Sequence, residues 1–361
     1  MTYRLFAGTY AGTIHILRLD TDQITLADGA ALADGAALAG GAATPGPGNP
    51  SFLAFHPRLP VLYAANELGT FQGGFGGAVS AYAIAADGTL AWHASQPTHG
   101  ADPCHLAVDP TGHWLVVANY TSGHVTTFPL GADGLPAPAS QVLAHQGAGL
   151  DPARQAGPHP HHVAMLDGRV LVSDLGTDNV VAYRLDDAAG ALVADGPAIA
   201  TPAGGGVRRI ARHPGAPWTY ALNEMHATIT RFRSGEPGGW RACDTVSMLP
   251  AGYAGPASGA ELAIVPSGRF LHASVRGHDS IATFAIDPAD GALALRGHVP
   301  SGGATPRHFE ISPCGRFLVV ANQDSNRVVL FRLDPEGGGI HDTGQSVEVP
   351  EPACIRFAPA P

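Results

Sequence analysis

The chain has 361 residues, 47 of them glycine and 31 proline, and it contains no lysine, so every positive side chain is an arginine. The missing lysine excludes a Schiff-base lysine and the lysine-containing phosphate loop of nucleotide-binding enzymes. The formal net charge of -10 argues against nucleic acid as a partner, because binding a phosphate backbone requires a basic surface.

Strand and turn residues dominate the chain, since short apolar runs alternate with Gly- and Pro-rich turns. No apolar run is long enough to span a membrane, and the start "MTYRLFAGTY" does not have the pattern of a signal peptide. The four cysteines lie far apart without a C-x-x-C pair, which indicates unpaired thiols. We therefore expect a cytoplasmic protein that makes no membrane contact.

The first elements in chain order are two strands within "YRLFAGTYAGTIHILRL", residues 3–19. They are followed by a low-complexity segment, residues 27–48, in which ADGAAL occurs twice. This composition predicts a surface loop without a function of its own.

From residue 50 onward, a short strand and turn recur seven times, beginning with "PSFLAFHP". Most copies continue into a second and a third strand, as in "WLVVANYTSGHVTTFPL". A period near fifty residues is typical of β-propeller blades of four antiparallel strands. Successive copies are 46 to 57 residues apart, as their last residues show: Pro57, Pro110, Asp167, Pro214, Pro266, Pro313 and Pro359.

The seventh copy, "PACIRFAP", is followed by no further strand, whereas residues 3–19 have the pattern of the second and third strands of a blade. One blade would thus combine both ends of the chain and close the ring. The sequence predicts an all-β fold, a seven-bladed β-propeller that forms a single domain over residues 1–361. An open solenoid or two β-sandwiches are the alternatives that the even spacing disfavours.

The tight turn joins the first two strands of each blade into a hairpin, so the residues before the first strand and after the second lie at the same end. An asparagine recurs after the second strand, and we expect it to be structural. The neighbouring positions vary and are rich in Arg, His and Glu, which predicts a polar pocket built from many blades. The candidates include His105, His161, Arg208, Arg209, Glu224, Arg276, His308, Arg307 and Glu67.

Several arginines in this predicted pocket indicate a small anionic ligand, and a His or Glu beside them can transfer protons. No G-x-S-x-G motif is present, so an acyl-enzyme is not expected, whereas hydrolysis by activated water and direct proton abstraction both stay open. Each candidate also has a structural alternative: His161 could be a packed histidine, and Glu224 could only bridge Arg208 or Arg276. The inner-strand residues Arg209, His308 and His105 could point between blades.

Three histidines, His159, His161 and His162, raise the question of a metal site. Neighbours in one strand cannot all face one ion, and no carboxylate has a supporting spacing. The sequence therefore predicts neither a metal nor another cofactor.

Several stretches resemble the lactonase family of seven-bladed propellers, which includes bacterial propeller-type 6-phosphogluconolactonase and fungal carboxy-cis,cis-muconate cyclase. They are "HPHHV", "SDLGTDNVVAYRL", "ALNE", "RGHDSI" and "PRHFEISPCGRFLVVANQDSNRVVLFRLD". The likeness covers essentially the whole chain. It implies a catalytic set that matches His161, Arg208, Glu224 and Arg276 here, with Arg307 and Arg154 as further candidates for anion contact. The chain departs from the family at Val207-Arg208-Arg209, where Pro-Arg-His is common.

The resemblance implies a lactonase that opens a sugar-acid lactone, most directly 6-phosphogluconolactone in the pentose phosphate route. Arg208, Arg276 and Arg307 would bind the anion and polarise the carbonyl, and Glu224 or His161 would activate water. A cycloisomerase acting on a carboxylated muconolactone is the alternative, and a non-catalytic binding propeller is a third reading. We expect a small anionic lactone as the partner, and a monomer or a weak homo-oligomer.

Overall fold

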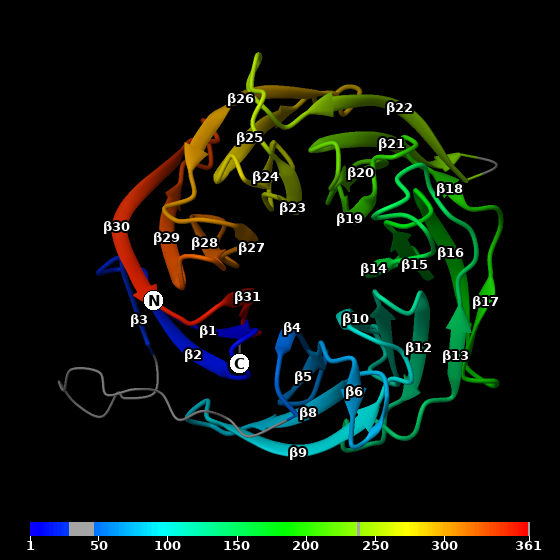
Figure 1. The fold of residues 1–361 in the computed structure, drawn as a ribbon. Helices are drawn as coiled ribbons and strands as arrows, with labels where there is room; N and C mark the ends of the chain where they lie inside the picture. The colour runs from blue at the N-terminus through cyan, green and yellow to red at the C-terminus, as the bar shows by residue number, and fades with distance from the viewer. Residues whose placement is uncertain (29–46, 237–238, 360–361) are drawn as a thin grey trace.

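Seven of the sheets formed by the described strands are arranged as blades around a central channel, as seen in the computed structural model (Figure 1). The structure describes residues 1–28, 47–236 and 239–359, so most of the predicted surface loop 27–48 lies outside the described residues. Each blade is antiparallel, with its innermost strand beside the channel. The predicted seven-bladed β-propeller is confirmed.

The first three blades contain these strands from the channel outward: β4 (Pro50–Phe55), β5 (Val61–Asn66), β8 (Ala78–Ile84) and β9 (Leu90–Pro97); β10 (Pro103–Val108), β11 (Trp114–Asn119), β12 (His124–Pro129) and β13 (Gln141–Ala144); β14 (Pro160–Leu166), β15 (Arg169–Asp174), β16 (Asn179–Asp186) and β17 (Ala191–Ala194). The third blade also holds a short strand, β18 (Ile199–Ala200), which pairs with β16.

The next three blades are built in the same order: β19 (Val207–Arg212), β20 (Trp218–Asn223), β21 (Thr228–Glu236) and β22 (Gly239–Ser247); β23 (Ser258–Ile264), β24 (Phe270–Arg276), β25 (Ser280–Ile286) and β26 (Leu293–Pro300); β27 (Pro306–Ile311), β28 (Phe317–Asn322), β29 (Arg327–Leu333) and β30 (Ile340–Glu348).

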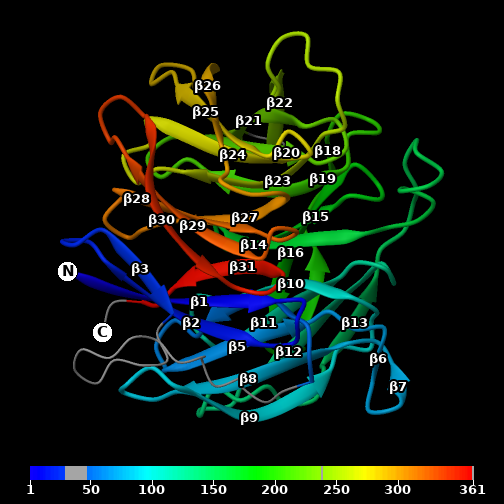
Figure 2. The same cartoon turned by 60° about the vertical axis from the view of Figure 1, so that its left-hand side comes forward.

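The seventh blade joins the two ends of the chain, as predicted. Its inner strand β31 (Pro352–Phe357) pairs antiparallel with β1 (Thr2–Thr9), which continues into β2 (Ile14–Asp20) and β3 (Thr25–Asp28). Figure 2 shows β31 beside β1. Hydrogen bonds between the first and last strands thus close the ring.

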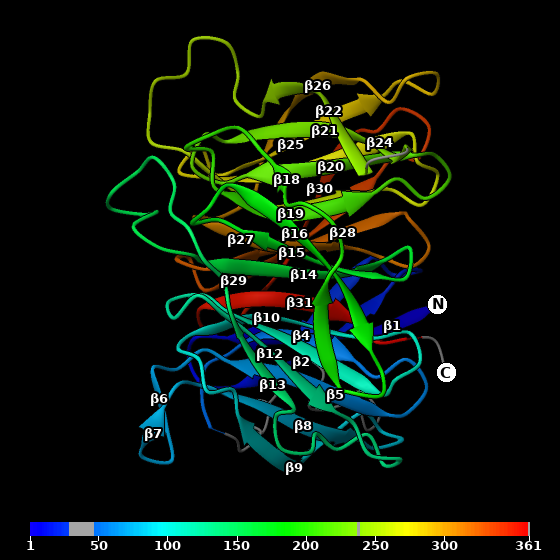
Figure 3. The same ribbon diagram turned by 90° about the vertical axis from the view of Figure 1, so that its right-hand side faces the viewer.

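The Gly-rich turn of the first blade contains structure that the sequence did not reveal. It forms a two-stranded hairpin of β6 (Thr70–Phe71) and β7 (Gly74–Phe75). In the side view, this hairpin projects from the face opposite the chain termini (Figure 3). Because it follows directly on the second strand of its blade, the hairpin marks the face where the predicted polar residues meet.

Apolar side chains fill the spaces between neighbouring blades. Two buried tyrosines also tie one blade to the next, since the Tyr63 hydroxyl donates to the Gly134 carbonyl at 2.6 Å and that of Tyr220 to the Gly291 carbonyl at 2.7 Å. Among the described residues, none belongs to a helix that could cross a membrane. All four cysteines lie in the described part and are free thiols.

A β-bulge near the start of every inner strand is the feature that builds the site. In β14, for example, Pro160 pairs with Asp174 and His162 pairs with Ser173, so His161 is an extra residue. The same shift occurs in the other six inner strands. Consecutive side chains of a regular strand point to opposite faces, but a bulge lets two neighbours face the same side. Each blade can therefore present two successive side chains to the channel.

Candidate functional site

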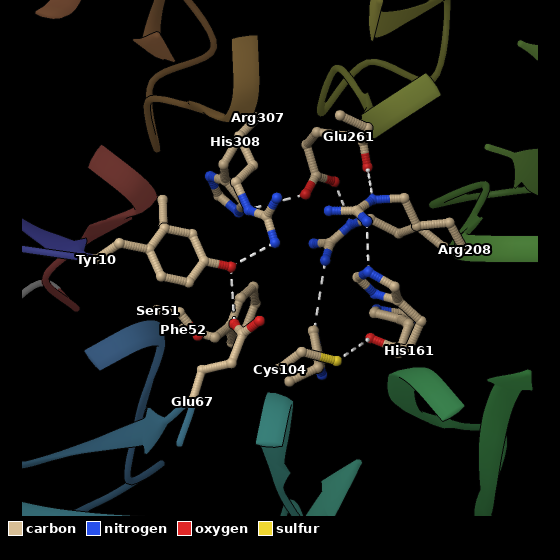
Figure 4. Close-up of a pocket in the computed structure, with 15 residues that line it drawn as sticks. Tyr10, Ser51, Phe52, Glu67, Cys104, His161, Arg208, Glu261, Arg307 and His308 are labelled. Atoms are coloured by element: carbon tan, nitrogen blue, oxygen red, sulfur yellow. Dashed lines mark hydrogen bonds and ion pairs between the residues drawn. The ribbon is translucent and has the colours of Figure 1, made fainter. Parts of the chain in front are cut away.

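The paired side chains line a cavity at one end of the channel, shown in Figure 4. An upper layer consists of the extra residues of the bulges and a lower layer of the residues that follow them. The upper layer contains Ser51, Cys104, His161, Arg208, Ala260, Arg307 and Ala353, and the lower layer contains Phe52, His105, His162, Arg209, Glu261 and His308. Tyr10 and Glu67 complete the lining. Residues from all seven blades thus meet at one small polar cavity.

Glu224 lies directly after β20 and is surrounded by three arginines. Its carboxylate is 2.7 Å from Arg208 Nη1, 2.7 Å from Arg154 Nη2 and 3.0 Å from Arg276 Nη2. Only 4 % of the Glu224 side chain is exposed. Three of the four residues of the predicted catalytic set therefore touch, and Arg154 joins them from the loop between β13 and β14.

These cations control the charge of Glu224. Burial alone would raise the pKa of Glu224, but Arg208, Arg276 and the other positive groups hold it well below its usual range. The carboxylate thus stays ionised at neutral pH and is a weak proton acceptor. Its contacts suit it to holding the arginines in place.

His161, the fourth residue of the set, contacts the same cluster from the neighbouring blade. Arg208 Nη1 donates a hydrogen bond to His161 Nε2, and Arg208 Nε donates to the Ala260 carbonyl at 2.8 Å. Burial and then the Arg208 charge hold the pKa of His161 well below its usual value. His161 is therefore neutral at physiological pH, and Arg208 engages one of its ring nitrogens.

Arg307 of β27 lines the cavity two blades away from Arg208. Its Nη2 donates to the Tyr10 hydroxyl, which in turn donates to Glu67 Oε2 at 2.8 Å. The guanidinium also lies over the Tyr10 ring, 5.0 Å from its centroid. Within residues 1–28, 47–236 and 239–359, Arg307 has no carboxylate within ion-pair distance, unlike Arg208.

The lower layer contains the residues that could have pointed between blades. Arg209, His105 and His308 instead line the channel, below the Arg208 cluster. Arg209 Nε pairs with Glu261 Oε1, and His308 Nε2 is 3.3 Å from Glu261 Oε2. The bulge explains the difference, because it turns two consecutive side chains toward the channel.

The three histidines considered for metal binding do not converge. His159 stacks on Tyr120, with the ring centroids 4.5 Å apart, and its Nδ1 contacts the Tyr120 carbonyl oxygen. His161 contacts Arg208, whereas the His162 ring lies 4.3 Å from that of His105 in the lower layer. His159 and His161 also share a contact with the Tyr120 ring, which lies 5.5 Å from the His161 ring, but among the described residues no three such side chains form a metal-binding group.

The recurrent asparagines are the last residues of the second strands and are buried. Asn66 Nδ2 donates to the Gly48 carbonyl at 2.7 Å, and Asn322 Nδ2 donates to the Ser301 carbonyl at 2.9 Å. These hydrogen bonds tie the end of the second strand to the chain segment beside it, which fits the structural part expected of them.

Tyr10 and Glu261 line the cavity but are not among the site residues predicted from the sequence. Tyr10 follows β1 just as Glu67 follows β5, so the pattern of second strands could have identified it once residues 3–9 were aligned with them. Glu261 directly follows Ala260 in β23, and no motif distinguishes it. Its orientation depends on the bulge, which the sequence does not mark.

Comparisons with known proteins agree with this architecture. The family model described as "Lactonase, 7-bladed beta-propeller" matches residues 5–357. A 6-phosphogluconolactonase of Bacillus subtilis is 32% identical over 315 residues, covering 86% of this chain and 87% of the relative. One of Serratia proteamaculans is 29% identical over 260 residues, covering 71% and 72%. The structure of a periplasmic gluconolactonase of Pseudomonas aeruginosa superposes with a TM-score of 0.89 at 32% identity and covers 100% of both chains.

Proposed function

The chain belongs to the lactonase family of seven-bladed β-propellers, and from this premise we propose that it hydrolyses 6-phosphogluconolactone to 6-phosphogluconate. The names of its relatives support lactone hydrolysis in general. The observation that carries the finer proposal is the pair of guanidinium groups of Arg208 in β19 and Arg307 in β27, which line one cavity from two blades separated by a single blade. A sugar-acid lactone with an anionic group at its far end presents two negative or polarisable sites to such a pocket.

Arg307 is suited to bind the anionic end of the substrate. Its only hydrogen-bond acceptor among the described residues is the neutral Tyr10 hydroxyl, so the charge has no carboxylate partner there. Burial raises the pKa of Tyr10, which keeps the phenol protonated. A phosphate or carboxylate would receive a charge-assisted, forked contact from Arg307, which is the geometry guanidinium groups favour.

Arg208 is suited to polarise the lactone carbonyl. It lies in the cavity wall, while Glu224 and the Ala260 carbonyl fix its guanidinium. A fixed cation stabilises the negative charge that develops on the carbonyl oxygen when water attacks, because little reorganisation is needed during the reaction. In this proposal Glu224 holds Arg208, Arg276 shares the Glu224 carboxylate, and His161 fixes the orientation of Arg208 from the other side.

Replacing Arg307 by glutamine tests the anion contact. We expect KM for 6-phosphogluconolactone to rise about 10- to 100-fold, the usual scale for losing a hydrogen bond to a charged group. KM for the unphosphorylated gluconolactone should rise much less, because this substrate lacks the anionic group. Initial rates for both substrates measure this difference, and an equal loss on both would argue against Arg307 as the anion contact.

The function itself is tested with purified protein and freshly prepared 6-phosphogluconolactone, after subtraction of spontaneous hydrolysis. Turnover above that background supports the proposal, and its absence would remove it. A carboxylated muconolactone in a parallel assay distinguishes cycloisomerase activity. Activity on that substrate alone would replace the hydrolase by the cycloisomerase.

The cellular compartment and the oligomeric state stay predictions. One similar structure is that of a periplasmic protein, so family membership does not fix a cytoplasmic location. We retain the proposal of a cytoplasmic monomer or weak homo-oligomer that acts in the pentose phosphate route. Cell fractionation and light scattering would test these points.

A further inference from the structure

The contacts around His161 and Glu224 leave water activation without an assigned base. Glu224 is occupied by three guanidinium groups, and His161 accepts a hydrogen bond from Arg208. Hydrolysis of a lactone still requires that the attacking water lose a proton. If the proposed function holds, a further residue of the cavity must accept this proton.

We propose that Glu261, in the lower layer of the cavity, is the general base that accepts this proton. This inference rests on the proposed lactone hydrolysis. It assigns the catalytic step to a carboxylate that lies beside the proposed carbonyl-polarising group, and it treats Glu224 as a positioning residue.

The position of Glu261 follows from the bulge in β23. Gly259 pairs with Val275 and Leu262 pairs with Ala273, so Ala260 and Glu261 both stand opposite Ser274. The Glu261 N–H donates to the Ser274 hydroxyl at 3.0 Å, which satisfies the backbone group at this irregularity. The side chain is thereby directed into the cavity that Arg208 also lines.

Glu261 is close to the place where the carbonyl would be polarised. Arg208 Nε donates to the carbonyl of Ala260, the residue directly before Glu261. A water molecule that attacks a lactone held by Arg208 would therefore approach from the neighbourhood of the Glu261 carboxylate. The other carboxylate that lines the cavity, Glu67, lies instead on the Tyr10 and Arg307 side, where it accepts the Tyr10 hydroxyl.

The surroundings of Glu261 suit a group that takes up and releases a proton. Oε1 accepts from the Leu262 N–H at 2.9 Å and pairs with Arg209, and Oε2 is 3.3 Å from His308 Nε2. His308 Nδ1 accepts the Ile355 N–H at 3.3 Å, so the proton of the neutral ring lies on Nε2, which makes no hydrogen bond to the described residues. The Leu262 N–H and Arg209 hold the carboxylate in one orientation, with His308 close by.

The charge state agrees with this geometry. Burial raises the pKa of Glu261 to about 7, although Arg209 opposes the shift. The charged or titratable groups that face Glu261 are Arg208 and Arg209 of β19, His308 of β27 and Arg356 of β31, whereas the adjacent β24 presents Ser274. A base whose pKa lies close to the working pH combines a large ionised fraction with substantial basicity.

The proposed step balances without a further reactant. The water oxygen forms a bond to the carbonyl carbon as one water proton passes to Glu261. The ring C–O bond then breaks, and the leaving alkoxide takes the proton back from the Glu261 carboxylic acid. The product is the open hydroxy acid, which releases its own carboxyl proton to solvent, and Glu261 is again a carboxylate.

The test compares Glu261→Gln with wild type from about pH 5.5 to 8.5, a range that brackets the Glu261 pKa. For wild type, we expect kcat/KM to rise with pH through an ionisation near 7, because only the carboxylate form is active. In the glutamine variant this pH-dependent rise should disappear. Its kcat should be about 10²- to 10⁴-fold lower than that of wild type, with little change in KM. Glu310→Gln is the matched control, since Glu310 is another carboxyl with a raised pKa, 25 % exposed, that pairs with Arg356 and does not line the cavity.

A variant that keeps the acidic group distinguishes loss of the base from a folding defect. Glu261→Asp should retain the pH-dependent rise with a lower kcat. Infrared difference titration of wild type against Glu261→Gln gives a readout without substrate, and should show one carboxyl group that ionises near neutral pH. A pH-dependent rise that survives in Glu261→Gln, or disappears in Glu67→Gln, would overturn the inference. Absence of turnover in wild type would instead count against the proposed function.

Discussion

Replacing Glu224 by glutamine should lower both the stability and the activity of the protein. The substitution keeps the shape of the side chain but leaves Arg208, Arg276 and Arg154 without their shared negative charge. Removing one partner of a buried ion pair costs roughly 3–5 kcal/mol of unfolding free energy. We expect a loss on this scale at pH 7, measured by denaturant unfolding.

The same variant should lose most of its lactonase activity, because Arg208 and Arg276 would repel each other and leave their positions. Glu224→Asp keeps the charge and should retain more of both properties. Asp244→Asn is a matched control, since Asp244 pairs with Arg231 at 2.9 Å on an outer strand with 42 % of its side chain exposed. Because Asp244 is open to solvent and Arg231 keeps Asp290 as a second carboxylate at 3.7 Å, we expect a loss of about 0–1 kcal/mol for Asp244→Asn. Equal losses for Asp244→Asn and Glu224→Gln would contradict the assignment.

The pH dependence of the Glu224 effect has a defined sign. Since the arginines lower the folded-state pKa below the ordinary value of 4.5, the stabilisation is fully present above that value. It is lost as the pH falls through the folded-state pKa. The difference in unfolding free energy between wild type and Glu224→Gln should therefore be constant near neutral pH and shrink in acid.

The second large effect is expected for Arg208→Lys. A lysine ammonium cannot keep the contacts to Glu224, His161 and the Ala260 carbonyl in the same fixed plane. We expect kcat to fall about 10²- to 10³-fold, as for the loss of one fixed donor to a developing oxyanion, while KM changes less. Steady-state rates on 6-phosphogluconolactone measure the split between kcat and KM.

Two further variants test whether the effect is specific to Arg208 and to its contact with Glu224. Arg184→Lys changes an exposed arginine of an outer strand and should leave the rates unchanged. In the double variant Arg208→Lys, Glu224→Gln, the loss of activity should be smaller than the product of the two single losses, because the residues act as one unit. Independent, multiplicative losses would show that Glu224 does not act through Arg208.

The repeats were sufficient to predict the ring, since each copy carries its own turn and apolar alternation. The blade formed by β31 and β1 could also be predicted, because residues 3–19 have the pattern of the strands missing after the last copy. The hairpin of β6 and β7 could not, since its Gly-rich sequence has no strand periodicity. Local patterns therefore predicted regular elements and missed irregular ones.

The site was also predictable only in part, because local patterns place regular elements but not irregular ones. Hairpin geometry was enough to place Glu224 and Arg276 at the end of the channel where His161 and Arg208 begin their strands. The two layers were not predictable, because strict alternation allows only one of Arg208 and Arg209 to face the channel, whereas the bulge directs both there. The orientation of Glu261 depends on the same irregularity.

A crystal structure with bound 6-phosphogluconate tests the central claim most directly, namely that the layered side chains of seven blades bind an anionic lactone between two arginines. We predict the phosphate at Arg307 and Tyr10, and the C1 carboxylate at Arg208 with one oxygen facing Glu261. Product bound at the opposite end of the channel, or in the reverse orientation with its phosphate at Arg208, would contradict the account.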